Sequence, residues 1–554
     1  MESYNVASNL ARRAEQAPYR PGVIFPAGRD HRGRAQFTQL SFRQLNDLSD
    51  RYAHGLTAYG VGMGDRVLLM VRPGVELIAV TFALIKMGAV PVMIDPGMGR
   101  RAFLQCVRDA APTAFIGIPL AHALRVLFPG TFRTVEHAVT VGRRWFWDGV
   151  TLDAVEAASR EPFPIAPTTT ESEAAVAFTS GSTGMPKGVL YLQGMFRAQI
   201  ELLKEEIGVE EGEVDLPGLY IFALFNPALG VTTVFPDMDP TRPARVNPAH
   251  LVEAIQTHGV TNSFGSPVIW KRVARYCLEN DIRLPSIRRI VMAGAPVPPS
   301  LIEDFSHILD GGDIYTPYGA TEALPLTMMK GREILEETAA LSDRGQGMCV
   351  GRATAGNTLR VIRLTDEPLP EWDDALLLPD GEVGEVVVKG PVVTRLYLNR
   401  PEQTAGAKIY EGEEVWHRMG DLGYFDAQGR LWFCGRKSHR VETTEGLLLP
   451  VPCEAIFNRH PRVARTAVVG VGPRGAQQPV LVVEPLPGEM PRTRAERRAF
   501  SEELLALGAA HERTRGIREV LFHPTFPVDV RHNAKIHRLE LGRWAEKRGA
   551  GERR

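Results

Sequence analysis

Residues 177–191, AFTSGSTGMPKGVLY, combine three glycines with serines, threonines and one lysine, Lys187. Glycines let backbone N–H groups converge on a phosphate, hydroxyl groups add donors, and a lysine supplies positive charge. The spacing is not that of a Walker A loop, because Lys187 lies between Pro186 and Gly188. A flexible linker is disfavoured, since apolar segments flank the stretch. We therefore predict a phosphate-binding loop, whose candidate residues are Thr179, Ser180, Gly181, Ser182, Thr183, Gly184 and Lys187.

Two further segments carry residues suited to nucleotide chemistry. In MAGAP, which follows an apolar strand, the small residues Gly294, Ala295 and Pro296 would let a flat ring approach the backbone. The alternative is a tight turn between a strand and a loop. In TPYGATEALP, residues 316–325, Glu322 offers the carboxylate oxygen that Mg²⁺ prefers beside phosphates. Taken alone, Glu322 would be interpreted as a surface carboxylate.

These segments need a scaffold, and the stretch from residue 66 to residue 95 indicates its type. RVLLMV is a short apolar strand, GVELIAVTFALIKMG is long enough for a helix, and VPVMID is a second strand. Strands that are apolar on both faces and joined through a helix are typical of a buried parallel sheet. The same succession recurs around AAVAFT and IRRIVMAGAP. We predict an α/β fold, with buried parallel sheets and helices in a large N-terminal domain.

The pattern changes toward the C-terminus. GEVGEVVVKG and GRLWFCG are short β segments that indicate a small β-rich subdomain, and after them short strands and helices alternate. We predict an N-terminal domain at 1–434, a hinge at 435–440 and a small, mobile α+β C-terminal domain at 441–554. GVGPRG, residues 470–475, fits a dinucleotide-binding pattern, but a strand-like segment follows it where that pattern needs a helix. We predict a hairpin turn there.

The composition is that of an ordinary globular protein. The 554 residues exceed one compact domain, and 44% are hydrophobic and 23% charged. A net charge of −1 gives no sign of nucleic acid or an anionic membrane as partner. The five cysteines are far apart without a CxxC pair, which argues against a disulfide scaffold or a structural zinc site and favours the cytoplasm. The N-terminus lacks the apolar core of a signal peptide, and charges interrupt the most apolar run, so we expect no transmembrane segment.

The loop TSGSTGMPKGV resembles the signature loop of the adenylate-forming superfamily of acyl-CoA synthetases, luciferases and peptide-synthetase adenylation domains. Other segments of that superfamily occur here in the same order and cover nearly the whole chain. The resemblance implies ATP and Mg²⁺ as cofactors, with the loop around the β- and γ-phosphates and MAGAP along adenine. It also implies that Tyr318 and Gly319 contact the nucleotide, Tyr318 by stacking on adenine, that Thr321 binds the α-phosphate and that Glu322 holds Mg²⁺.

The resemblance extends to three residues nearer the C-terminus. In RMGDLGY, Asp421 matches the residue that binds both ribose hydroxyls, since one carboxylate can accept two such bonds. Arg436 matches an arginine near the ribose and marks the hinge, whose usual Asp or Lys is replaced by Ser438. FPVDVRHNAKIHR resembles the catalytic-lysine motif in a longer form, with alanine in place of glycine. Lys535 would bridge the substrate carboxylate and the α-phosphate, because a point charge stabilises the charge that builds on phosphorus.

Several strings, among them FALFNPALG, GRKSHRVETTEG and FPVDVRHNAKI, more closely resemble the β-lactone synthetases of bacterial olefin biosynthesis. This implies that ATP activates a long-chain 2-alkyl-3-hydroxy fatty acid to an acyl-adenylate and pyrophosphate. The substrate's 3-hydroxyl then displaces AMP to form a β-lactone, helped by an intramolecular effective molarity of about 10⁵–10⁸ M. The alternative is a long-chain fatty acid–CoA ligase. A non-catalytic nucleotide- or lipid-binding protein is a third hypothesis, disfavoured by the combination of Lys187, Glu322 and Lys535.

The second nucleophile leaves fewer marks in the sequence. In LYIFALFNPALG, Ala223 takes a position where acyl-CoA synthetases often carry histidine. The apolar stretch suggests an acyl pocket, and a plain buried strand and loop is the alternative. His439 is a hypothetical base for the hydroxyl, with a solvated hinge histidine as the alternative. The expected partners are a small fatty-acyl substrate and, by resemblance, other olefin-synthesis enzymes, without nucleic acid.

Overall fold

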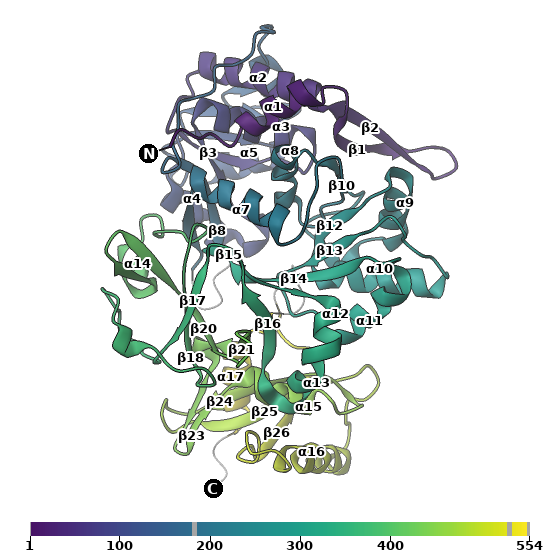
Figure 1. Cartoon of the computed structure of the whole chain (residues 1–554), viewed down its shortest axis with the longest axis vertical. Helices are drawn as coiled ribbons and strands as arrows, with labels where there is room; N and C mark the ends of the chain where they lie inside the picture. Colours follow the sequence, from purple (N-terminus) through teal and green to yellow (C-terminus); the bar gives the residue numbers. More distant parts are fainter. Residues whose placement is uncertain (1, 180–184, 529–534, 551–554) are drawn as a thin grey trace.

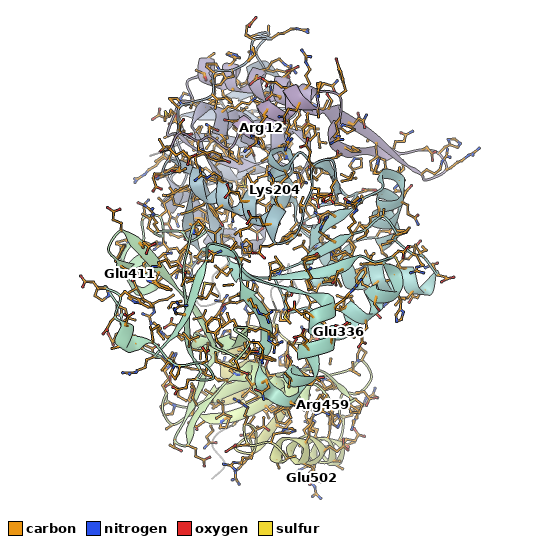
Figure 2. All side chains as sticks on the ribbon, in the orientation of Figure 1. Arg12, Lys204, Glu336, Glu411, Arg459 and Glu502 are labelled. Carbon is orange, nitrogen blue, oxygen red and sulfur yellow. The ribbon has the colours of Figure 1, made fainter. Side chains whose placement is uncertain are left out.

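The computed structural model describes residues 2–179, 185–528 and 535–550. Figure 1 shows an elongated molecule, with the N-terminal half at one end and the C-terminal domain at the other. Charged side chains project along the whole length, from Arg12 in α1 (Ser8–Gln16) to Glu502 in α16 (Arg494–Ala509) (Figure 2). This distribution fits the balanced net charge.

A seven-stranded sheet carries the predicted phosphate loop at one edge. As the sequence predicts, β3 and β4 are parallel neighbours connected through α3 (Val75–Met87), which is buried along almost its whole length. Each neighbouring pair is parallel except β8 and β9, which form a hairpin. In spatial order the strands are β7 (Val150–Thr151), β6 (His137–Thr140), β5 (Ala114–Gly117), β3 (Arg66–Met70), β4 (Val90–Met93), β8 (Glu173–Thr179) and β9 (Lys187–Leu192).

A second, mixed sheet joins the parallel core and the β-rich subdomain in one hydrogen-bonded path. Its parallel part runs from β1 to β14, and a tight antiparallel hairpin from β14 to β15 leads into the antiparallel part. The strands in order are β17 (Thr358–Ile362), β18 (Gly384–Lys389), β20 (Glu414–Phe425), β21 (Leu431–Arg436), β16 (Met348–Ala353), β15 (Ala323–Lys330), β14 (Asp313–Ala320), β13 (Arg289–Met292), β12 (Asn262–Gly265), β10 (Val214–Asp215), β11 (Thr232–Val234), β1 (Pro21–Arg29) and β2 (Ala35–Ser41), with β19 (Lys408–Glu411) beside β20.

The C-terminal part has its own small sheet and core. The order is β24 (Val463–Val471), β25 (Gln478–Pro485) and β26 (Glu519–Phe522), and a short hairpin of β22 (Val441–Thr443) and β23 (Gly446–Leu448) lies beside it. β24 and β25 are antiparallel neighbours, so GVGPRG forms the predicted hairpin turn. Phe457, Phe500 and Leu504 are buried in this core. The predicted boundaries at 434 and 441 fall close to the end of β21 and to η7 (Lys437–His439).

Helices cover both large sheets. The largest buried hydrophobic cluster contains side chains of α3 and of strands from both sheets. All five cysteines are buried and free. Among the described residues, no helix is long and apolar enough to cross a membrane.

The remaining helices are α2 (Phe42–Tyr59), α4 (Arg100–Ala110), α5 (Pro119–Leu127), α6 (Leu152–Val155), α7 (Gln193–Glu205), α8 (Asn226–Leu229), α9 (Pro248–His258), α10 (Pro267–Glu279), α11 (Pro299–Ile308), α12 (Gly331–Glu333), α13 (Ala339–Leu341), α14 (Pro401–Ala407), α15 (Pro450–Phe457) and α17 (Arg538–Lys547).

Candidate active site

The predicted phosphate loop connects β8 to β9 at the edge of the seven-stranded sheet. Thr179 is the last residue of β8 and pairs in antiparallel register with Lys187, the first residue of β9. The strands therefore bring the two ends of the loop together. Ser180, Gly181, Ser182, Thr183 and Gly184 lie outside the described residues, so their phosphate contacts stay a prediction.

Lys187 and Glu322 meet at Tyr397, which lies in the loop before α14. The Tyr397 hydroxyl donates a hydrogen bond to Glu322 Oε1 over 2.8 Å, and Lys187 Nζ lies 4.5 Å from the centre of the Tyr397 ring. Burial lowers the pKa of Lys187, while the charge of Glu322 opposes that shift. One aromatic side chain thus connects the cation of the loop with the carboxylate that the sequence assigns to a metal.

The turn that carries Thr321 and Glu322 joins β14 to β15 and is held from two sides. The Tyr191 hydroxyl donates to the Thr321 carbonyl over 2.5 Å. Thr394 donates to the Glu322 carbonyl twice, from its backbone N–H over 2.9 Å and from Oγ1 over 3.0 Å. These bonds fix the backbone of the turn, so the Glu322 carboxylate is placed by the fold itself.

Lys408, at the start of β19, is a buried cation behind this turn that the sequence analysis missed. Its ammonium donates to the Thr394 carbonyl and lies 6.0 Å from the centre of the Tyr397 ring. Burial is the main cause that lowers the pKa of Lys408 to about 7. The charge of Glu322 opposes this shift, and the charge of Lys187 adds to it. No spacing around Lys408 signals burial, because its position in the core depends on how β19 packs.

Asp421 and Arg436 form a second polar group on neighbouring strands. They are partners in the antiparallel register of β20 and β21, and Asp421 is 2% exposed. The Tyr318 hydroxyl donates to Asp421 Oδ2 over 2.6 Å, and Arg436 Nη1 lies 3.0 Å from Oδ1. This second contact is one of charge rather than a hydrogen bond, because Oδ1 accepts no hydrogen bond from the described residues. An acceptor oxygen therefore remains for a ligand hydroxyl.

The charges of these two groups act on each other. Burial raises the pKa of Asp421; Arg436 opposes that shift, and Glu322 adds to it. The pKa of Arg436 is raised first by Asp421 and further by Glu322. The fold therefore brings Lys187, Tyr318, Glu322, Asp421 and Arg436 together, although they come from both large sheets.

The segment with Gly294, Ala295 and Pro296 follows β13 directly. β13 is parallel to β14, which carries Tyr318, so both leave the sheet at the same edge. Gly294 has a φ of +87°, in the left-handed region that favours glycine. At Gly319, a Cβ atom would lie 2.5 Å from the Ala323 carbonyl oxygen, so the tight turn before Glu322 requires glycine.

Lys535 is exposed and lies between β26 and α17. His537 lies two residues after Lys535. His537 and its neighbour Arg538 lie close enough to the hinge for their charges to lower the pKa of His439. Burial is the main cause that lowers the pKa of His439 to about 3, followed by the charges of Arg538 and Arg436. The segment that carries Lys535 thus adjoins the hinge beside Arg436, the partner of Asp421.

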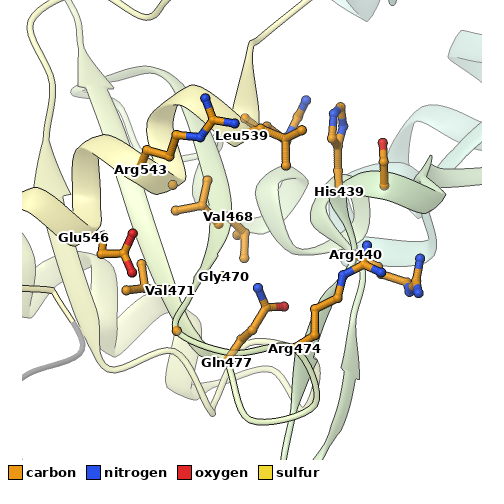
Figure 3. Close-up of a pocket in the computed structure, with 15 residues that line it drawn as sticks. His439, Arg440, Val468, Gly470, Val471, Arg474, Gln477, Leu539, Arg543 and Glu546 are labelled. Atoms are coloured by element: carbon orange, nitrogen blue, oxygen red, sulfur yellow. The ribbon is translucent and has the colours of Figure 1, made fainter. Parts of the chain in front are cut away.

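A cavity of about 220 Å³ lies at the hinge, with His439 and Arg440 on one side and Arg543 and Glu546 of α17 on the other (Figure 3). Arg474 also lines this cavity. Arg440 and Arg474 both form ion pairs with Asp366 of the N-terminal part, over 2.5 Å and 3.3 Å respectively. These ion pairs connect the two sides of the hinge.

A second cavity, of about 30 Å³, lies against the hairpin of β14 and β15. Phe222 of η2 (Tyr220–Leu224) and Phe264 stack with ring centres 3.5 Å apart. LYIFALFNPALG thus forms η2 and α8 rather than a strand, and two of its aromatic side chains, Phe222 and Phe225, line this small apolar cavity. The lining includes Phe222, Phe225, Phe264, Pro317 and Pro325, together with Gln199 of α7.

Comparisons with known proteins show the family to which the chain belongs. Residues 10–398 match the family model of AMP-binding enzymes. The chain is 48% identical to the olefin beta-lactone synthetase of Stenotrophomonas maltophilia over 98% of both chains, and 47% identical to that of Xanthomonas campestris pv. campestris over 98% of this chain and 97% of the relative. A long-chain-fatty-acid–CoA ligase of Thermus thermophilus is 27% identical over 85% of this chain and 84% of the relative.

Solved structures confirm the fold. An amide bond synthetase from Marinactinospora thermotolerans superposes with a TM-score of 0.78 at 24% sequence identity, covering 97% of this chain and 99% of that chain. An anthranilate CoA ligase in complex with anthranoyl-AMP superposes with a TM-score of 0.79 at 20% identity, covering 99% of both chains. The predicted α/β fold with a large N-terminal and a small C-terminal domain is therefore confirmed.

Proposed function

The chain belongs to the AMP-binding enzyme family, and from that premise we propose that it is a β-lactone synthetase. It would activate a long-chain 2-alkyl-3-hydroxy fatty acid with ATP, and the 3-hydroxyl would then displace AMP and close a β-lactone. The observation that carries this proposal is the identity of 48% over 98% of both chains to a named olefin beta-lactone synthetase. The named CoA ligase relative is only 27% identical, so CoA ligation remains the weaker alternative.

The residues of the site fit ATP. Lys187 supplies a cation at the loop end, and Asp421 keeps one buried acceptor oxygen that suits the ribose hydroxyls. In this proposal Tyr318 and Gly319 lie at the adenine with Gly294, Ala295 and Pro296, while Thr321 and Lys535 contact the α-phosphate. Burial raises the pKa of Asp421, and the positive charge of Arg436 opposes that shift and so favours the charged form of the carboxylate.

Glu322 is the residue that we propose as the ligand of Mg²⁺. It is a carboxylate beside the phosphate loop, and its hydrogen bond from Tyr397 and its fixed backbone orient it. When bound, Mg²⁺ would neutralise phosphate charge during the attack of the substrate carboxylate. Tyr397 also keeps Lys187 beside Glu322, so positive charge is present before the nucleotide binds.

In the second step the nucleophile is the 3-hydroxyl of the substrate, and we assign no strong base to it. His439 is a weak candidate base, because its pKa of about 3 lies far from neutral pH. The aromatic and aliphatic side chains that line the cavity beside the turn would limit the access of water to an acyl-adenylate, which would slow its hydrolysis. We propose that the reaction takes place in the cytoplasm, which suits five free cysteines, and that the domain boundaries lie at 434 and 441. Association with other olefin-synthesis enzymes stays a prediction.

The deciding experiment supplies ATP, Mg²⁺ and a 2-alkyl-3-hydroxy fatty acid in the absence of CoA. We expect β-lactone, AMP and pyrophosphate in equal amounts, measured by mass spectrometry and phosphate release. AMP release that depends on added CoA would instead support the ligase. Absence of pyrophosphate exchange with every acid tested would support the non-catalytic binding protein.

Tyr397→Phe is expected to raise the Mg²⁺ concentration for half-maximal turnover by about 10-fold, since it removes one hydrogen bond to a carboxylate. The ring beside Lys187 stays in place, so the KM for ATP should change less. Titration of turnover with Mg²⁺ at saturating ATP measures the effect. Tyr424→Phe is the matched control, because the Tyr424 hydroxyl donates its hydrogen bond to Gln346 and not to Glu322. Equal Mg²⁺ dependence in both variants would refute the role of Tyr397.

A further inference from the structure

Gln199 is a polar side chain in an otherwise apolar cavity. It lies on α7 and is 7% exposed, and the other lining residues are aromatic or aliphatic side chains and prolines. Its Nε2 donates to the Leu324 carbonyl over 2.9 Å. That bond assigns the amide orientation, so the remaining atom is the carbonyl oxygen, Oε1.

Oε1 of Gln199 accepts no hydrogen bond from the described residues, although it is buried. A buried acceptor without a partner is costly, and native proteins keep few of them. Gln193 on the same helix shows the usual arrangement, because it is 1% exposed and its Oε1 accepts from the Val6 N–H over 2.9 Å. Because Gln199 also lines the cavity, its unpaired oxygen is able to accept a hydrogen bond from a donor that enters with a ligand.

Gln199 contacts the strand that directly follows the turn carrying Glu322. Leu324, the hydrogen-bond partner of Gln199, is two residues after Glu322. The Cα atoms of Leu324 and Glu322 therefore lie within about 7 Å of each other. The cavity of about 30 Å³ exceeds the roughly 10–15 Å³ that one water molecule needs. A hydroxyl group close to the carboxyl end of an acid has the right size and the right chemistry for this space.

We propose that the Gln199 carbonyl accepts a hydrogen bond from the hydroxyl group of the acid substrate and selects hydroxy acids over acids that lack it. This inference rests on the proposed function, since it assigns the 3-hydroxyl of that substrate to Gln199. An amide oxygen cannot take up the proton at neutral pH. Gln199 therefore recognises and orients the hydroxyl, and it does not act as a base.

The test compares a 2-alkyl-3-hydroxy fatty acid with the same acid lacking the hydroxyl. Adenylation is measured as pyrophosphate release with hydroxylamine as a trap, because the deoxy acid cannot close a ring. We expect the wild type to prefer the hydroxy acid by about 10–100-fold in kcat/KM. In Gln199→Met, which keeps the length of the side chain, this preference should fall to about threefold or less, mainly through the KM of the hydroxy acid.

Two further variants separate recognition from structure. Gln199→Glu should keep most of the preference, because burial among apolar side chains keeps the acid protonated, with one oxygen to donate to Leu324 and one to accept. Gln193→Met removes an equally buried amide from α7 and should slow both acids alike, which leaves the ratio unchanged.

Three results would overturn the inference: an unchanged ratio in Gln199→Met, an equal loss of preference in Gln193→Met, or a wild type that uses both acids equally well. A wild type that releases no pyrophosphate with either acid would refute the proposed adenylation itself, and the assignment of Gln199 with it. The two failures are therefore distinguishable.

Discussion

Lys535→Ala is expected to lower the rate of adenylate formation by about 10²–10³-fold, while ATP still binds. The ammonium of Lys535 would stabilise charge that develops only when the carboxylate attacks the α-phosphate, so its loss should reduce kcat far more than it raises the KM for ATP. Arg538, three residues after Lys535, lies close enough to the hinge to act on the pKa of His439, while the role of Lys535 itself stays a prediction. Pyrophosphate exchange measures the rate, and calorimetry with ATP measures binding.

The matched control for Lys535 is Lys547, an exposed lysine at the end of α17. Lys547→Ala removes the same charge from the same domain and should retain turnover within about twofold, in line with the small effects of exposed charges. Turnover of Lys535→Ala close to wild type would show that another group performs the role. Loss of ATP binding in Lys535→Ala would point instead to a structural defect.

Glu322→Ala is expected to reduce kcat/KM by at least about 10²-fold and to abolish recovery of turnover at high Mg²⁺. The variant removes the proposed metal ligand and also leaves the Tyr397 hydroxyl and the two neighbouring lysines without their carboxylate. Turnover is measured over a range of Mg²⁺ concentrations, and Mn²⁺ is added as a second cation to test for a weakened metal site.

Two variants separate the metal role of Glu322 from its structural role. Glu322→Gln keeps an oxygen that can accept from Tyr397 but loses the charge, so a metal ligand predicts loss of turnover in a stable protein. Glu402→Ala, at an exposed carboxylate at the start of α14, should have no effect on Mg²⁺ dependence. Unchanged Mg²⁺ dependence in Glu322→Ala would refute the assignment.

Local sequence patterns were sufficient for several of the elements. The apolar run of α3 between two short strands defines a βαβ unit whatever surrounds it, and the GVGPRG segment is a turn because a strand follows it. These predictions succeed because spacing along one or two strands already decides them. The contacts of Asp421 and Arg436 with the ribose were implied by resemblance and stay a prediction, and the register of β20 and β21 places the two residues as partners.

The cluster behind Glu322 could not be predicted in the same way. Thr394, Tyr397 and Lys408 are ordinary residues in their local sequence, and Gln199 is one of two glutamines on α7. Most of these roles arise from contacts between segments 75 to 130 residues apart, such as Tyr397 with Glu322, Tyr191 with Thr321 and Gln199 with Leu324. Burial then changes their chemistry, as the pKa of Lys408 shows.

The amino-acid sequence was enough to indicate activation of a substrate on a nucleotide, because the phosphate loop, the acidic turn and the C-terminal lysine motif resemble the segments of the adenylate-forming superfamily in the same order. The contacts that hold the acidic turn in place, and the buried oxygen of Gln199 that lacks a hydrogen-bond partner among the described residues, became visible only in the tertiary structure. The physical reason is that charge stabilisation and hydrogen-bond satisfaction depend on distance in space and on exclusion of water, and both are set by packing between distant segments.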